Sequence, residues 1–121
     1  MMARIIAVDD ALAIRSAIKL ILSHHGHDVF DFENGKDAIE FARQESVDLV
    51  ITDLNMPEMN GMSLISSLRR LEDYEHTPIL VMTTETADYK KKKAKSVGAT
   101  GWIAKPFTEE RILKALNKVL S

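Results

Sequence analysis

Short apolar segments alternate along this chain with segments whose apolar residues recur at helical spacing, and the alternation repeats five times. The apolar runs lie at 5–8, 29–32, 47–52, 78–83 and 102–104. The residues that follow them form stripes with the offsets of an amphipathic helix, as in Ile14, Ala17, Ile18, Ile21 and Leu22. Strict strand–helix alternation implies a parallel sheet with right-handed crossovers and helices on both faces. We therefore predict an α/β fold, a single doubly wound five-stranded parallel sheet in one domain over 1–121.

Capping and turn residues indicate where the helices begin and end. Gly26 and Gly98 are expected to end the first and fourth helices, and Asn34-Gly35 is interpreted as a turn before the second. The third helix is marked by Leu64, Ile65, Leu68 and Leu71, the fourth is predicted over 88–97, and Thr108 is expected to cap the fifth. The fourth helix carries a run of lysines, so only Ala87, Ala94 and Val97 remain for its inward face. A helix with so little apolar surface is expected to be weakly held.

Composition excludes several classes of protein. The chain has 45% hydrophobic residues, a formal net charge of −2 and no cysteine, which argues against disulfides, thiolate metal sites and any general attraction to nucleic acid. It also lacks an apolar stretch of membrane-spanning length and a signal-peptide core at its N-terminus. We expect a cytoplasmic monomer that binds neither nucleic acid nor membrane.

Polar residues follow the predicted strands. The central apolar run ends on Asp53, the first ends on Asp9 and Asp10, the fourth on Thr83, and Lys105 follows the fifth. Taken alone, Asp53 could simply cap a loop or helix. The carboxyl ends of parallel strands share one edge of the sheet, however, and open α/β sheets bind ligands there. The coincidence of these residues favours a functional site.

Three carboxylates at one edge repel one another and favour a bound cation. Because the strand ends offer oxygen ligands and neither cysteine nor histidine, Mg²⁺ or Mn²⁺ is expected rather than zinc. Lys105 adds a positive charge and Thr83 a hydroxyl, and both groups suit a phosphoryl oxygen that develops charge in a transition state.

These residues resemble a known family. Asp9-Asp10, Asp53 with Met56-Pro57 and Gly61, Thr83, and Lys105-Pro106-Phe107 look like the signature positions of response-regulator receiver domains, specifically the CheY-like chemotaxis type. The resemblance covers the whole chain, and it alone implies the flavodoxin-like strand order 2-1-3-4-5, for which such regulators are a standard example.

The resemblance implies specific roles. Asp53 would be the catalytic phosphoacceptor for a histidine kinase, and the chain would not otherwise be an enzyme, catalysing only its own phosphorylation and autodephosphorylation. Asp10 and Asp53 would bind Mg²⁺ through carboxylates, Asn55 through its backbone carbonyl and Asp9 through water. Lys105, preceding Pro106 in a cis peptide bond, would pair with Asp53 and the phosphoryl oxygens. Thr83 would move toward the phosphoryl group and let Trp102 turn inward.

Other positions concern the subfamily and its partners. Asn55 and Glu85 resemble flagellar chemotaxis regulators, and no effector domain follows Ser121 in this sequence, so chemotaxis and flagellar motor control are the expected use. The output partner would be a flagellar switch protein, and a phosphatase is a further partner. A phosphotransfer domain would be the partner if the chain were instead a phosphorelay carrier or phosphate sink. The output surface would include Trp102, Lys91 and Lys92, unless the lysine run is only a solvated face.

Two other classes share parts of this pattern. A haloacid-dehalogenase-type phosphatase also uses a strand-end aspartate, but Asn55 stands where its second aspartate belongs. A flavin carrier shares the fold, but Asp9-Asp10 would repel its phosphate. A metal role for His24, His25 and His27 is considered less favoured than an interaction with the negative end of the first helix.

Overall fold

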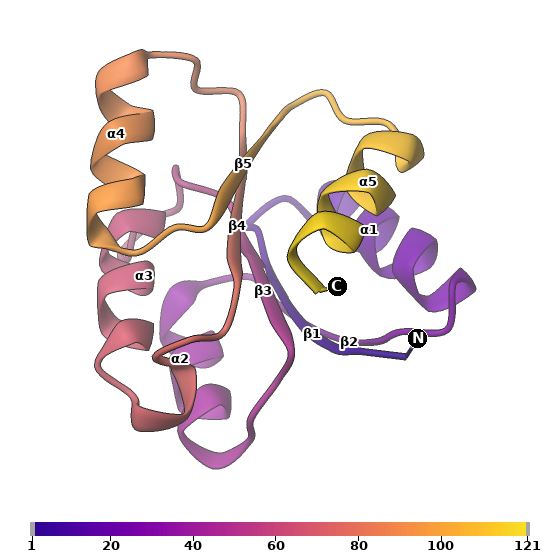
Figure 1. Ribbon diagram of the computed structural model, residues 1–121, viewed down its shortest axis with the longest axis horizontal. Coiled ribbons are helices and arrows are strands. Elements are labelled where there is room, and N and C mark those ends of the chain that lie inside the picture. The colour runs from indigo at the N-terminus through magenta and orange to yellow at the C-terminus, as the bar shows by residue number, and fades with distance from the viewer. Residues whose placement is uncertain (1, 121) are drawn as a thin grey trace.

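A computed structural model describes residues 2–120 of the chain. The strands are β1 (Arg4–Val8), β2 (Asp28–Phe32), β3 (Leu49–Thr52), β4 (Ile79–Thr83) and β5 (Gly101–Ala104). The helices are α1 (Leu12–His24), α2 (Gly35–Gln44), α3 (Gly61–Arg69), α4 (Asp88–Val97) and α5 (Glu109–Leu120), with a short 3-10 helix η1 (Glu72–Tyr74). The strands form one parallel sheet in the order β2-β1-β3-β4-β5 (Figure 1), which confirms the predicted fold class and strand order.

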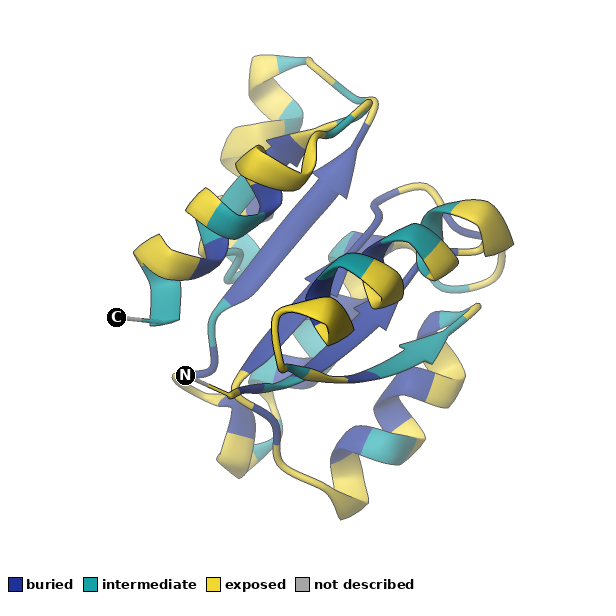
Figure 2. Ribbon diagram, turned by 90° about the vertical axis from the view of Figure 1, so that its right-hand side faces the viewer, coloured by how far each residue is buried: buried dark blue, intermediate teal, exposed yellow. Residues whose placement is uncertain are grey.

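The sheet lies between two helical layers, α1 and α5 on one face and α2, α3 and α4 on the other (Figure 1). Alternation along β1 shows why its run is continuously apolar: Ile5 and Ala7 belong to the core beneath α1 and α5, whereas Ile6 and Val8 belong to the opposite core. All four are essentially buried, and the buried residues of the sheet lie between the exposed outer faces of the helices (Figure 2). The core therefore holds the strand ends in place from both sides.

The start of α2 differs from the prediction. Asn34-Gly35 does not form a separate turn, because Asn34 is the N-cap of α2 and its side chain accepts a hydrogen bond of 2.8 Å from the backbone N–H of Asp37. Gly35 is buried there, and a Cβ on it would lie 2.8 Å from the sulfur of Met59. The Asn-Gly pair thus begins the helix and allows the loop around Met59 to pack against it.

The third helix is shorter than predicted, since α3 ends at Arg69 and Leu71 lies outside it. The half-buried guanidinium of Arg69 provides the physical reason. It donates to the carbonyl oxygens of Tyr74 at 2.6 Å, Thr77 at 2.7 Å and Gly98 at 2.7 Å, which turns the chain back toward the helix end. Burial lowers the pKa of Arg69 from its usual value.

Several local predictions are confirmed. Thr108 caps α5 through a 3.2 Å hydrogen bond from the N–H of Arg111, and Gly98 follows α4 with a φ of 122°. The Lys105–Pro106 bond is cis. Ala94 is the buried residue of α4, and Ala87 and Val97 are partly buried beside it. Among the described residues, no helix has both the length and the apolar character that crossing a membrane requires.

Candidate functional site

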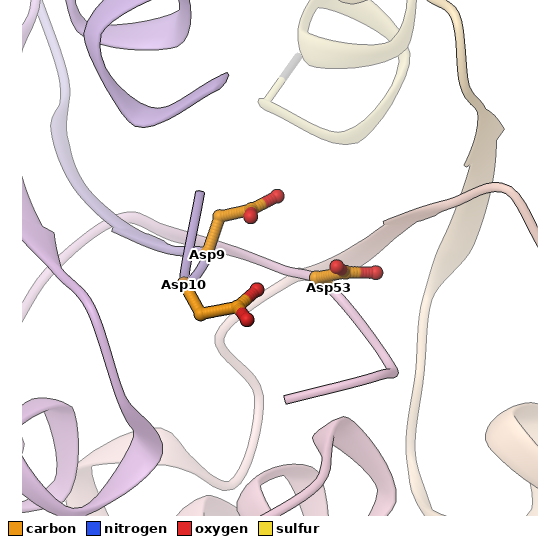
Figure 3. Close-up of side chains that lie close together, drawn as sticks. All are labelled: Asp9, Asp10 and Asp53. Atoms are coloured by element: carbon orange, nitrogen blue, oxygen red, sulfur yellow. The ribbon is translucent and has the colours of Figure 1, made fainter. Parts of the chain in front are cut away.

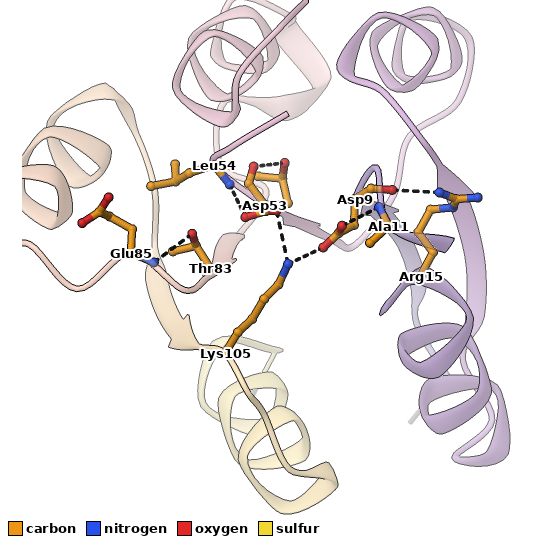
Figure 4. Close-up of polar contacts among 9 residues, drawn as sticks. Asp9, Ala11, Arg15, Asp53, Leu54, Thr83, Glu85 and Lys105 are labelled. Carbon is orange, nitrogen blue, oxygen red and sulfur yellow. Dashed lines mark hydrogen bonds and ion pairs between the residues drawn. The ribbon is translucent and has the colours of Figure 1, made fainter. Parts of the chain in front are cut away.

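The carboxyl ends of four strands meet at one edge of the sheet. Asp9 and Asp10 directly follow β1, Asp53 follows β3, Thr83 ends β4 and Lys105 follows β5. The carboxylates of the three aspartates extend toward a common space (Figure 3), and the side chain of Lys105 reaches between Asp53 and Asp9 (Figure 4). The structure therefore brings together the acidic and basic residues that the sequence placed at this edge.

Asp53 is held by contacts on both its backbone and its side chain. Its N–H donates to the carbonyl of Val8 at 3.0 Å, which ties the end of β3 to β1. Its Oδ1 accepts a 2.8 Å hydrogen bond from the N–H of Leu54, and its Oδ2 lies 3.2 Å from the Nζ of Lys105. These contacts fix the rotation of the carboxylate, and Asp53 as a whole residue is buried, with an exposed fraction of 8%.

Asp9 is the most enclosed of the acidic residues, with 2% of its surface exposed. Its Oδ1 accepts from the N–H of Ala11 at 2.9 Å and its Oδ2 from the Nζ of Lys105 at 2.6 Å. A buried carboxylate is stable only when such partners replace water. Asp9 therefore anchors Lys105 beneath the site, while Asp10 is exposed.

Lys105 is the positive charge of the site. Burial by itself would lower the pKa of its ammonium, but the hydrogen bond to Asp9 and the charges of Asp53 and Asp9 outweigh burial, so the pKa is raised. The ammonium thus remains charged between the two carboxylates.

The donor set fits a hard divalent cation. One oxygen from each of Asp9, Asp10 and Asp53 lies within 4.8 Å of the others. With the ammonium of Lys105 included, three carboxylates leave a local charge of −2, which a divalent cation would balance. Because all the side-chain ligands are carboxylate oxygens, Mg²⁺ and Mn²⁺ suit the cluster better than soft or imidazole-seeking metals.

Thr83 and Glu85 form a separate hydrogen-bonded turn between β4 and α4. The hydroxyl of Thr83 is buried and accepts from the N–H of Glu85 at 3.2 Å. The carboxylate of Glu85 accepts from the N–H of Ala87 and pairs with Lys90 at 3.0 Å. The hydrogen bond from Lys90 is the main reason that the pKa of Glu85 is lowered, and the same pair raises the pKa of Lys90. Thr83 is therefore linked through Glu85 to the start of α4.

Trp102 lies on β5 next to α4, away from the end of the strand. It pairs with Val81, whereas Ala104 pairs with Thr83. The Nζ of Lys91 lies 5.7 Å from the centre of the indole ring. The indole Nε1 is buried and has no hydrogen-bond partner among residues 2–120. Lys91 and Lys92 are both exposed on α4, and Lys91 is the one that the structure places beside Trp102.

The other residues singled out in the sequence are Asn55 and the histidines. Asn55 is exposed in the loop after β3. The histidines form no joint metal cluster in the described part of the chain. His25 instead pairs with Glu109 at 3.2 Å, and the Nδ1 of His27 accepts from the N–H of Ala3 at 3.0 Å. Burial, followed by nearby positive charge, lowers the pKa of His27.

Arg15 is a residue of this region that the sequence pattern did not single out. This side chain extends from α1 to the loop formed by Asp9, Asp10 and Ala11, which we call the acidic loop. It donates a hydrogen bond to the backbone carbonyl of Asp9 at 2.9 Å (Figure 4). One signal was available: Arg15 stands close to the positive N-terminal end of α1, where an unpaired cation is unfavourable.

Comparison with known proteins gives consistent results across the chain. The family model of the response regulator receiver domain matches residues 5–117. Protein PilH of Pseudomonas aeruginosa is 37% identical, with 99% of each chain covered. A chemotaxis protein CheY homolog of Campylobacter jejuni is 38% identical, covering 97% of this chain and 92% of that protein. The crystallised chemotaxis protein CheY4 of Vibrio cholerae is similar with a TM-score of 0.96 and 42% identity, covering 99% of this chain and all of that one.

Proposed function

Because this chain belongs to the response regulator receiver domain family, we propose that Asp53 accepts a phosphoryl group from a histidine kinase and that the resulting acyl phosphate changes partner binding. The observation that carries the proposal is the buried Asp53 carboxylate, fixed by Leu54 and Lys105 beside two further aspartates. Membership of the family makes the chain a signalling domain rather than a metabolic enzyme.

The residues of the site divide the work of phosphoryl transfer. A carboxylate oxygen of Asp53 attacks the phosphorus, and the bond from phosphorus to the donor nitrogen breaks. The Leu54 N–H holds the carboxylate in one orientation. The ammonium of Lys105 pairs with Asp53 before transfer and would pair with the phosphoryl oxygens as negative charge develops on them. Mg²⁺, when held by Asp9, Asp10, Asp53 and the carbonyl of Asn55, would supply neutralising charge for the transferred group.

In this proposal, the turn formed by Thr83 and Glu85 transmits phosphorylation of Asp53 to helix α4 at the surface. To bind a phosphoryl oxygen, the Thr83 hydroxyl would have to reorient from its contact with the N–H of Glu85. Glu85 also holds Ala87 and Lys90 at the start of α4, so this movement would disturb the first turn of that helix. Trp102 lies beside Lys91 of the same helix, and we propose that this pair responds to the change.

The proposed output is of the chemotaxis kind, since relatives from Campylobacter and Vibrio carry that name. A cavity of about 390 Å³ beside β5 is lined in part by Lys91, Trp102, Arg111, Lys114 and Lys118. A basic surface around one large aromatic side chain suits an acidic amphipathic partner segment. Replacing Lys91 and Lys92 with Gln should weaken that binding and reduce its salt dependence, and unchanged values at two ionic strengths would show that the lysines are only a solvated face.

Labelling with a small phosphodonor in the presence of Mg²⁺ tests the central proposal. Asp53→Asn should abolish labelling, whereas Asp28→Asn, at the exposed opposite end of the sheet, is the matched control and should label normally. Labelling of Asp53→Asn at the wild-type rate would move the acceptor elsewhere. A pull-down with and without a stable phosphoryl mimic then separates a flagellar switch protein from a phosphotransfer domain.

A further inference from the structure

Arg15 makes two contacts that join α1, β2 and the acidic loop. Its Nη1 donates to the carbonyl oxygen of Asp9 at 2.9 Å, and its Nε donates to Oδ2 of Asp31 at 3.1 Å. The other oxygen of Asp31 accepts from Lys19 at 3.2 Å. Only 13% of the Arg15 side chain is exposed, compared with 52% for Lys19. Arg15 is therefore held in one geometry, with its guanidinium between a carboxylate and a backbone carbonyl.

The carbonyl that Arg15 contacts belongs to the peptide group between Asp9 and Asp10. Every other polar group of Asp9 already has a partner: its N–H donates to Phe32, and its carboxylate oxygens accept from Ala11 and Lys105. Rotation about the Cα–C bond of Asp9 would move its carbonyl oxygen and, with it, redirect the Cα–Cβ bond of Asp10. The hydrogen bond from Arg15 opposes that rotation.

We propose that Arg15 is a positioning residue for the cation site, which it serves by orienting the exposed carboxylate of Asp10 through the carbonyl of Asp9. The inference rests on the proposed function, because that function supplies the divalent cation. Asp10 needs such support, since it is the exposed member of the acidic cluster, whereas Asp9 and Asp53 are buried. Groups that orient a metal ligand from outside typically change metal affinity by about 10- to 100-fold when removed.

A purely electrostatic role for Arg15 predicts changes of the opposite sign. Arg15→Met removes a positive charge, so Coulomb interaction alone would tighten cation binding, whereas loss of positioning would weaken it. Asp31→Asn removes a negative charge but keeps an acceptor for Arg15. Coulomb interaction alone would then weaken cation binding, whereas positioning would leave it nearly unchanged. The two variants together separate the two roles.

The experiment is a Mg²⁺ titration at constant ionic strength, followed by the backbone amide NMR shifts of residues 9–11 and 53–55. We expect Arg15→Met to raise the Kd by about 10-fold, Arg15→Lys to recover part of the loss, and Asp31→Asn to change it less than twofold. Arg4→Met is the matched control, since Arg4 also pairs with a carboxylate, Glu45, and a carbonyl, that of Ser46. The free energy of unfolding of Arg4→Met should fall, whereas its Kd for Mg²⁺ should stay at the wild-type value.

Each outcome bears on the inference. An unchanged or lower Kd in Arg15→Met would overturn it, as would a loss in Asp31→Asn as large as that in Arg15→Met. If Arg15→Met does not fold, the variants Arg15→Lys and Asp31→Asn test the positioning role in its place. An unchanged Kd for Mg²⁺ in Arg15→Lys, together with a raised Kd in Asp31→Asn, would contradict that role. If the wild-type chain itself fails to bind Mg²⁺, the proposed function fails and takes the inference with it.

Discussion

Gly61 offers a steric test of how the acceptor aspartate is held. It begins α3, is buried, and donates its N–H to the carbonyl oxygen of Leu54 at 2.8 Å. A Cβ added at Gly61 would overlap the carbonyl oxygen of Asp53 and lie only 2.8 Å from the Cα of Leu54. The φ of Gly61 lies outside the left-handed region, so alanine would meet a clash rather than a forbidden backbone conformation. Gly61→Ala should therefore push the acceptor backbone directly.

The size of the effect follows from these distances. Ordinary contact begins at 3.4 Å, so the Cα of Leu54 must retreat from 2.8 Å, a shift of about 0.6 Å. Overpacking of this kind costs about 1–3 kcal/mol, and the reduced freedom of the unfolded chain offsets about 0.4–1 kcal/mol. We expect the free energy of unfolding to fall by about 1–2 kcal/mol. Since misplacement by about 1 Å can slow a reaction 100-fold, labelling of Asp53 should slow by about 10-fold.

Two assays measure these effects: urea unfolding for stability and the rate of labelling by a small phosphodonor with Mg²⁺. Gly26→Ala is the control. Gly26 has a φ of 87° and no atom within 4 Å of an added Cβ, so alanine there should cost about 1 kcal/mol through backbone strain alone. It should leave labelling unchanged. Labelling of Gly61→Ala at the wild-type rate, or equal slowing in Gly26→Ala, would refute the argument that Gly61 positions the acceptor by contact.

Three further predictions concern other parts of the chain. Tyr74 is buried, and its hydroxyl donates to the carbonyl of Glu45 at 2.5 Å. Burial raises the pKa of Tyr74 to about 12. The residue therefore stabilises the fold fully below pH ~10, and this contribution is lost as the pH rises toward 12. Tyr74→Phe should cost about 1 kcal/mol at neutral pH and flatten the alkaline decline in urea unfolding; an unchanged decline would assign it to other groups. Lys105→Met leaves the buried carboxylate of Asp9 without its ammonium partner, so the free energy of unfolding in EDTA should fall by about 3 kcal/mol. Added Mg²⁺ should then raise the free energy of unfolding of this variant more than that of the wild type. An equal rise in both proteins would contradict the charge argument. Trp102 is the only tryptophan, and its emission should respond little to Mg²⁺ and more to a phosphoryl mimic, whereas the reverse order would remove this ring from the switch.

The architecture, and the residues that gather at the edge of the site, can be predicted from the amino-acid sequence. Continuous apolar runs require burial on both faces, and their strict alternation with helical stripes permits few arrangements other than a parallel sheet between two helical layers. Parallel strands end at one edge, so the residues after each run had to gather there. The convergence of Asp9, Asp10, Asp53 and Lys105 followed from chain order and needed no knowledge of contacts.

How these residues pair, and which groups support them, depends on contacts between distant parts of the folded chain. Lys105 lies 96 residues from Asp9, and whether its ammonium meets Asp9, Asp53 or both depends on how far β5 and its following loop sit from β1. Arg15 reached the Asp9 carbonyl, and Arg69 those of Tyr74 and Gly98, because helix placement brought long side chains to distant backbone groups. Hydrophobic periodicity records which face of an element is buried, but it carries no information about which polar atom lies within about 3 Å of another across the fold.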